Sequence, residues 1–200
     1  NALAAYTEVL PPETVIDIVW QRGNTMHGVV PRDAQGRSAY AMGVVRPNLA
    51  DLDHAGAEEL VDHVGARTGQ FIQIVNHNVR DRQYSVTGEL GALHALQAEL
   101  LRRQPAGGKP AWLAVPGLDV PFHSRVLHTA VPVFRDVLDR RLPSTIDPAK
   151  LVGRYIPNLV ARPFSLDDDF VREVALASAS GPLHAVLSQR EAWLGRDSEL

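Results

Sequence analysis

Residues 71–87 read FIQIVNHNVRDRQYSVT and predict a β-hairpin at the centre of the fold. The segment from Phe71 to Val75 has the character of a buried strand, and the segment from Tyr84 to Thr87 is rich in β-branched and aromatic residues. Between them the residues from Asn78 to Asp81 are polar and favour a turn. The elements around this hairpin then determine which sheet it joins.

A helix and a strand are expected on each side of the hairpin. Before it, apolar residues with the i, i+3, i+4, i+7 spacing of an amphipathic helix occur at Ala57, Leu60, Val61 and Val64. After it, a second apolar helical stripe is formed by Leu93, Leu96, Leu100 and Leu101. The outer strands are expected at residues 40–45 and 111–115. The resulting order, β-α-β-β-α-β over residues 37–116, is that of a ferredoxin-like subdomain.

Residues 1–36 and 117–200 flank this small subdomain. Pro11 and Pro12 favour a helix start, and an apolar stripe follows at Val15, Ile16, Val19 and Trp20. Beyond Pro116, one helix is expected with a single apolar face made of Leu127, Val131, Phe134 and Leu138. A strand is then expected at residues 155–160, followed by two further helices. We expect the two flanking segments to form one larger α/β subdomain that the small one interrupts.

The composition excludes several classes of function. The 200 residues include 20 Lys and Arg against 23 Asp and Glu, a net charge of −3, so neither nucleic acid nor an anionic membrane is the expected partner. Because Cys is absent, disulfides, Cys-ligated zinc and a Cys nucleophile are excluded. No apolar run approaches the roughly 20 residues of a membrane helix.

Two residues are the principal candidates for chemistry. His123 lies in a Pro-Phe-His-Ser loop at the entry to a helix, where a loop fixed by a scaffold can present a general base. The alternative is a His that only packs or caps at a junction between lobes. Arg22 follows an apolar helical stripe and precedes Gly23, so its guanidinium could bind a carboxylate or phosphate. The commoner alternative is a solvated Arg.

The remaining polar residues give weaker indications. Asn76 and Asn78 could bind a ligand through their amides, but a role in the hairpin turn is favoured. No HExxH motif or paired His–carboxylate pattern is apparent, so no metal site is expected. None of the serines lies in a Gly-x-Ser-x-Gly nucleophile elbow, and phosphate-binding glycine motifs are absent. The residues alone therefore lead to an α/β protein with a candidate base and a candidate anion-binding Arg.

Four segments together resemble one family. They are residues 21–26 (QRGNTM), 74–78 (IVNHN), 117–124 (GLDVPFHS) and 153–159 (GRYIPNL). In order and spacing they are similar to the C-terminal part of the malonyl/palmitoyl transferase domain of type I fatty acid synthases, of the fungal and actinobacterial kind. The resemblance implies an α/β-hydrolase-like large subdomain, incomplete here at residues 1–36 and 117–200, with an inserted ferredoxin-like small subdomain at residues 37–116.

The resemblance also assigns roles to residues. It implies ping-pong acyl transfer between coenzyme A and acyl carrier protein, with His123 as the general base and acid. Arg22 matches the Arg that pairs with the malonyl carboxylate. The further candidates for lining the site are Asn158, Met26, Ser124 and Asn76. The nucleophilic Ser of the family is expected upstream of Asn1, so the isolated 200 residues are expected to be inactive. The alternative is a non-catalytic structural or docking fragment of a multi-enzyme assembly.

The same resemblance implies the partners. Malonyl-CoA and palmitoyl-CoA, as coenzyme A thioesters, and the phosphopantetheine arm of acyl carrier protein are expected as substrates, with no bound cofactor. Other fatty acid synthase domains are expected in a large homo-oligomer of hexamer type, located in the cytoplasm.

Overall fold

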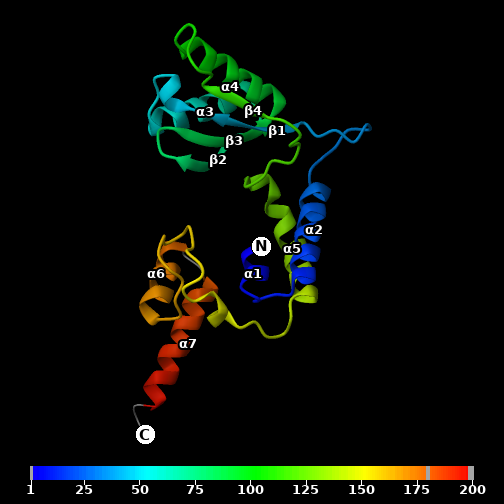
Figure 1. Ribbon diagram of the computed structural model, residues 1–200. Coiled ribbons are helices and arrows are strands. Elements are labelled where there is room, and N and C mark those ends of the chain that lie inside the picture. The colour runs from blue at the N-terminus through cyan, green and yellow to red at the C-terminus, as the bar shows by residue number, and fades with distance from the viewer. Residues whose placement is uncertain (1, 179–180, 198–200) are drawn as a thin grey trace. The chain divides into compact units, whose positions relative to one another are not determined.

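Residues 2–178 and 181–197 of the chain are described by a computed structural model (Figure 1). The chain divides into two compact units. One unit runs from Gln21 to Val137, and the other comprises the residues up to Trp20 together with those from Leu138 onward. The expected small subdomain, residues 37–116, lies wholly within the first of these units.

The unit from Gln21 to Val137 contains a four-stranded sheet. Its strands are β1 (Tyr40–Val45), β2 (Ile72–Val79), β3 (Gln83–Glu89) and β4 (Trp112–Val115). Their spatial order is β2-β3-β1-β4, and every neighbouring pair is antiparallel. In the register of β1 and β3, Gly43 lies opposite Val86. The hairpin expected from residues 71–87 is therefore the β2–β3 pair.

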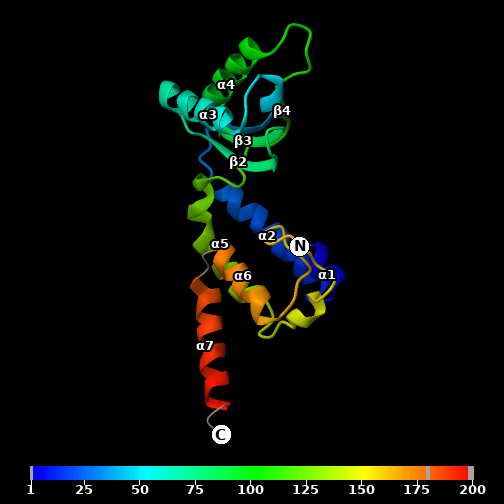
Figure 2. The ribbon, with the colours of Figure 1, turned by 90° about the vertical axis from the view of Figure 1, so that its left-hand side faces the viewer.

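Two helices cover one face of this sheet (Figure 2). Helix α3 (His54–Thr68) begins where the Asp53 carboxylate accepts a hydrogen bond of 2.8 Å from the Gly56 N–H. It ends at Gly69, which adopts φ +65° as helix-ending glycines commonly do. Helix α4 is Leu90–Arg103. The core between helices and sheet includes the fully buried side chains of Val64, Val86 and Leu96. The elements follow in the predicted order β-α-β-β-α-β, but Leu101 of the second predicted stripe is exposed.

The segments on either side of the sheet form a smaller apolar cluster. Before the sheet, helix α2 (Pro12–Gly28) leads into residues 29–38. After the sheet, the chain leaves β4 and passes through the 3-10 helix η2 (Arg125–Thr129) into α5 (Ala130–Arg141). A further 3-10 helix, η1 (Pro47–Leu49), lies between β1 and α3. Val30, Val120 and Leu127 are buried against one another, with Met26 and Phe122 packed on them. This cluster holds the end of α2 against the loop that contains His123.

The other unit contains four further helices. These are α1 (Ala2–Tyr6), the 3-10 helix η3 (Pro148–Leu151), α6 (Asp168–Ser178) and α7 (Gly181–Asp197). The Lys150 ammonium donates a hydrogen bond of 2.8 Å to the Glu8 carbonyl. Phe164 and Phe170 contact edge to face with ring centroids 5.3 Å apart. No helix in the described ranges is long and apolar enough to cross a membrane.

Two expectations for this part of the chain are wrong. Residues 155–160 form no strand; instead the Ala161 N–H donates to the Pro157 carbonyl and the Phe164 N–H donates to the Tyr155 carbonyl. Pro157 cannot donate to a ladder, which explains why local turns replace the strand. On α2 the buried residues are Val15 and Ile18, whereas Ile16 and Trp20, expected in the stripe, are 69% and 67% exposed.

Candidate functional site

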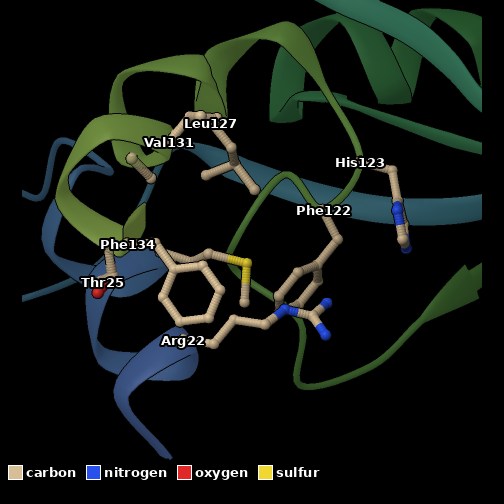
Figure 3. A pocket seen from close by; sticks show the side chains of 9 residues that line it. Arg22, Thr25, Phe122, His123, Leu127, Val131 and Phe134 are labelled. Atoms are coloured by element: carbon tan, nitrogen blue, oxygen red, sulfur yellow. The ribbon is translucent and has the colours of Figure 1, made fainter. Parts of the chain in front are cut away.

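An open pocket of about 230 Å³ lies within the unit from Gln21 to Val137 (Figure 3). Its walls come from the second half of α2, from the loop that precedes η2, and from η2 and α5. The lining residues are Arg22, Thr25, Met26, Phe122, His123, Leu127, Ala130, Val131 and Phe134. Most of this lining is apolar, so the guanidinium and the imidazole are the charged or titratable groups that the pocket offers a ligand.

Arg22 reaches the pocket from an open side of α2. A Cβ placed on the neighbouring Gly23 would meet nothing within 4 Å, so the helix surface there is accessible. In Figure 3 the Arg22 side chain extends toward the side of the pocket on which Phe122 lies. Within the described ranges, no carboxylate pairs with the Arg22 guanidinium. This exposed fork is therefore free to bind a carboxylate of a ligand.

His123 is held in an unusual backbone conformation. Its φ is +61°, a value that non-glycine residues rarely adopt. The turn around it is fixed by the buried Ser124, whose hydroxyl donates a hydrogen bond of 2.6 Å to the Pro121 carbonyl. The imidazole itself remains exposed at the edge of the pocket. Such conformations cost free energy and persist only where the surrounding structure fixes them. They occur more often at functional sites than elsewhere.

Two sets of contacts fix the loop on either side of His123. After it, the Arg125 N–H donates to the Gln73 side chain at 3.2 Å, and the Arg125 guanidinium lies 5.0 Å from the centroid of the Phe71 ring. Before it, Asp119 accepts two hydrogen bonds from Arg32. The loop is thus attached both to the sheet and to the segment that follows α2.

The pair of Arg32 and Asp119 is also an electrostatic feature of the site. Hydrogen bonding from Arg32 lowers the pKa of the Asp119 carboxyl from its ordinary value, against the opposing effect of burial. The same hydrogen bond raises the pKa of Arg32. Both groups therefore stay charged at neutral pH. Each neutralises the charge of the other.

The structure brings together some of the residues expected in the site. Arg22, Met26 and His123 line the same pocket, and Ser124 lies directly behind it as a buried residue. Asn76 does not line this pocket: it is an exposed residue of β2, paired with Ser85. Its position within a strand contradicts the expectation that it makes the turn. Asn158 is exposed in the other compact unit, so its role stays a prediction.

Several features were not recognised in the sequence. The helical face with Leu127, Val131 and Phe134 was expected to be apolar, but nothing in its spacing indicated that it lines a pocket. Arg32 and Asp119 are 87 positions apart, so no local pattern could pair them.

A cluster of two His and one Glu outside the pocket was also not predicted. His54, Glu58 and His77 place one ligand-type atom each within 4.8 Å of one another. The first two are four residues apart on α3, and His77 joins them from β2.

Known proteins resemble this chain in sequence and in fold. The fatty acid synthase beta subunit hexB of Dothistroma septosporum is 34% identical over 93% of the chain. The fatty acid synthase subunit beta of Saccharomyces cerevisiae is 30% identical over 95% of it. The chain spans only 12% and 11% of the lengths of these relatives. No family model matches the chain.

Solved structures extend the comparison to the fold. FabD from Acinetobacter baumannii superposes with a TM-score of 0.60 at 20% identity, covering 86% of this chain and 48% of that one. A type II polyketide malonyl-transacylase, solved in complex with its acyl-carrier protein, gives a TM-score of 0.53 at 20% identity, covering 81% of this chain and 45% of that one. The chain therefore has a malonyl transacylase-like α/β fold with an antiparallel sheet.

Proposed function

Because the chain is a homologue of one segment of the fungal fatty acid synthase beta subunits, we propose that it is the C-terminal part of an acyltransferase domain within a larger fatty acid synthase. Its substrates would be malonyl and palmitoyl groups, carried by coenzyme A or by the phosphopantetheine arm of acyl carrier protein. The observation that carries the proposal is the meeting of Arg22 and His123 in one largely apolar pocket. The pocket offers an apolar wall for an acyl chain and a cation for a carboxylate.

His123 is proposed to move the proton in each half-reaction. A Ser hydroxyl, supplied by the part of the domain upstream of this chain, would give its proton to the imidazole as its oxygen attacks the thioester carbonyl. The thiol of coenzyme A would then leave with the proton that the imidazole returns. In the second half-reaction the phosphopantetheine thiol attacks the acyl-serine, and His123 accepts that thiol's proton and gives it to the Ser oxygen. The backbone at His123 holds the ring in a fixed position for both transfers.

Arg22 is proposed to select the malonyl group. A guanidinium forms two parallel charge-assisted hydrogen bonds with a carboxylate, whereas a palmitoyl group offers it nothing comparable. Met26, Phe122 and Phe134 supply the apolar surface along which either acyl chain would lie. Asn158 and Asn76 have no proposed contact with the acyl group: Asn158 is assigned an orienting or structural role, and Asn76 a structural one in the hairpin.

The remaining parts of the proposal concern architecture. Residues 37–116 would be the ferredoxin-like small subdomain inserted into an α/β-hydrolase-like large subdomain, to which residues 1–36 and 117–200 contribute. The relatives' names indicate a multi-enzyme context, so we propose that the complete protein works in the cytoplasm as a large homo-oligomer of hexamer type. One of the structural neighbours is itself bound to an acyl-carrier protein. This supports an acyl carrier protein as the acceptor of the acyl group.

The substrate assignment is tested by loading the full-length protein with radiolabelled malonyl-CoA or palmitoyl-CoA. Arg22→Ala should lose malonyl loading and retain palmitoyl loading, because only the malonyl group uses the guanidinium. Arg80→Ala, which removes an exposed Arg at the hairpin, is the matched control and should load both. Equal loss of both acyl groups in Arg22→Ala would show that Arg22 is structural.

A further inference from the structure

The cluster of His54, Glu58 and His77 lies on the small subdomain, and none of its three residues lines the acyl pocket. His54 and Glu58 project from the first two turns of α3, and His77 projects from β2. In Figure 1 these two elements belong to the same subdomain, with α3 over the sheet. From this cluster we propose a binding site for a divalent transition-metal ion of the Zn²⁺ type.

Two of the distances within the cluster are close to those around a tetrahedral ion. The Glu58 Oε1 atom lies 3.6 Å from His54 Nε2 and 3.5 Å from His77 Nε2. Two ligand atoms bound to Zn²⁺ at its usual bond lengths with a tetrahedral angle are about 3.4 Å apart. The carboxylate oxygen thus already lies at nearly the required separation from both imidazoles, and the three ligand-type atoms all lie within 4.8 Å of one another.

A buried hydroxyl orients the first of the two imidazoles. His54 Nδ1 lies 3.0 Å from the hydroxyl of Tyr84, a fully buried residue of β3. Metal-bound imidazoles usually donate their second N–H to an oxygen acceptor such as a carboxylate, a carbonyl or water, and a phenol oxygen can take that place. The Tyr84 oxygen already accepts the Asp81 N–H at 2.8 Å, and its second lone pair can accept an Nδ1 proton from His54. A metal ion bound at His54 Nε2 would require this tautomer, in which Nε2 is the ligand atom.

Ring contacts restrain the second imidazole as well. The His77 ring packs edge to face on Tyr84, with centroids 4.8 Å apart, and on His54, with centroids 4.9 Å apart. The phenol ring therefore positions both imidazoles from within the core. Such support for ligand side chains distinguishes a preorganised site from a chance gathering of surface groups.

The chemistry of the ligands selects the class of ion. Two imidazoles and one carboxylate suit Zn²⁺, Cu²⁺ or Ni²⁺, whereas Mg²⁺ and Ca²⁺ prefer oxygen ligands. The three side chains are 33–49% exposed, which gives an ion access and leaves a fourth position for water or for a ligand from a partner. Because α3 and the β2–β3 hairpin would both hold the ion, it would link them and stabilise the subdomain.

Binding of Zn²⁺ and Co²⁺ to the full 200-residue chain tests this proposal. We expect one ion per chain by equilibrium dialysis, a rise in the thermal midpoint with ZnCl₂, and visible absorption typical of tetrahedral Co²⁺. His54→Ala, His77→Ala and Glu58→Gln should each abolish the absorption and the stoichiometric binding. Glu58→Gln keeps the shape of an exposed side chain, so it separates loss of a ligand from loss of the fold.

Two further variants complete the experiment. His63→Ala removes an exposed His from the same helix without touching the cluster, so it should bind as the unaltered chain does. Tyr84→Phe should weaken binding by about tenfold, because it removes a support of a ligand and not a ligand. Absence of stoichiometric binding, or binding that survives Glu58→Gln and His77→Ala, would overturn the proposal.

Discussion

Arg32 and Asp119 join two segments of the chain through a bidentate ion pair, with Nη1 to Oδ2 at 2.5 Å and Nη2 to Oδ1 at 3.2 Å. Arg32 follows the helix that presents Arg22, and Asp119 precedes the loop that presents His123. The pair lies beside the apolar cluster of Val30 and Val120. The ion pair and the apolar cluster together explain how Arg22 and His123, which are distant in sequence, come to line one pocket.

This ion pair predicts a dependence of stability on pH. The folded pKa of Asp119 is lowered, so its contribution is fully present above the ordinary carboxyl pKa of about 3.9 and is lost as the pH falls through the lower folded value. Asp119→Asn should therefore lower the urea midpoint at neutral pH, and its difference from the unaltered chain should shrink in acid.

Urea denaturation across this pH range measures the effect. Asp62→Asn, at an exposed position of α3, is the control and should shift the midpoint little at any pH. A difference between Asp119→Asn and the unaltered chain that stays constant into strong acid would contradict the assignment.

A side chain at position 43 in β1 is expected to lower stability for reasons of space. A Cβ there would lie 2.1 Å from Cη2 of Trp112, whose ring covers the glycine from the neighbouring strand. Gly43→Ala should lower the free energy of unfolding by about 1–3 kcal/mol, because the indole must move.

Gly23 provides the matched control for this substitution. It lies inside α2 with nothing within 4 Å of its built Cβ, so Gly23→Ala should raise stability by up to about 1 kcal/mol. Chemical denaturation of both variants decides the matter, and equal effects would show that contact with Trp112 is not the cause.

Helix α4 offers a similar contrast between its two faces. Leu96 is fully buried beneath the sheet, whereas Leu101 is 67% exposed. Leu96→Ala should cost about 2–5 kcal/mol of unfolding free energy through the cavity that it leaves. Leu101→Ala should change it by less than about 0.5 kcal/mol. Comparable losses in both variants, by calorimetry or denaturant, would mean that the described core is wrong.

Much of the small subdomain could be predicted because its signals are local. The stripes of Leu60 and Val64 and of Leu93 and Leu96 repeat at helical spacing, and each helix packs on a sheet whose strands lie near it in sequence. The prediction of a strand at residues 155–160 was wrong. Its apolar residues do not indicate a neighbouring strand to pair with, and Pro157 lacks the backbone N–H that a strand would donate.

The site could be predicted only in part. His123 and Arg22 were identified from their surroundings and from the resemblance, but the pairing of Arg32 with Asp119 depends on tertiary contacts that no spacing encodes. The positive φ at His123 is likewise invisible in the sequence, since most non-glycine residues in loops avoid it. His54 and Glu58 were readable as a pair, yet His77 joins them only through the sheet.

The central claim is that His123 transfers protons in an acyl transfer, and its most direct test separates that role from the backbone that His123 adopts. Asn tolerates a positive φ, so His123→Asn should fold as the unaltered protein does. In the full-length protein, transfer from malonyl-CoA to acyl carrier protein should fall by at least about a hundredfold. His128→Asn, at an exposed position in η2, should transfer normally. An unchanged rate of malonyl transfer in a folded His123→Asn variant would contradict the account.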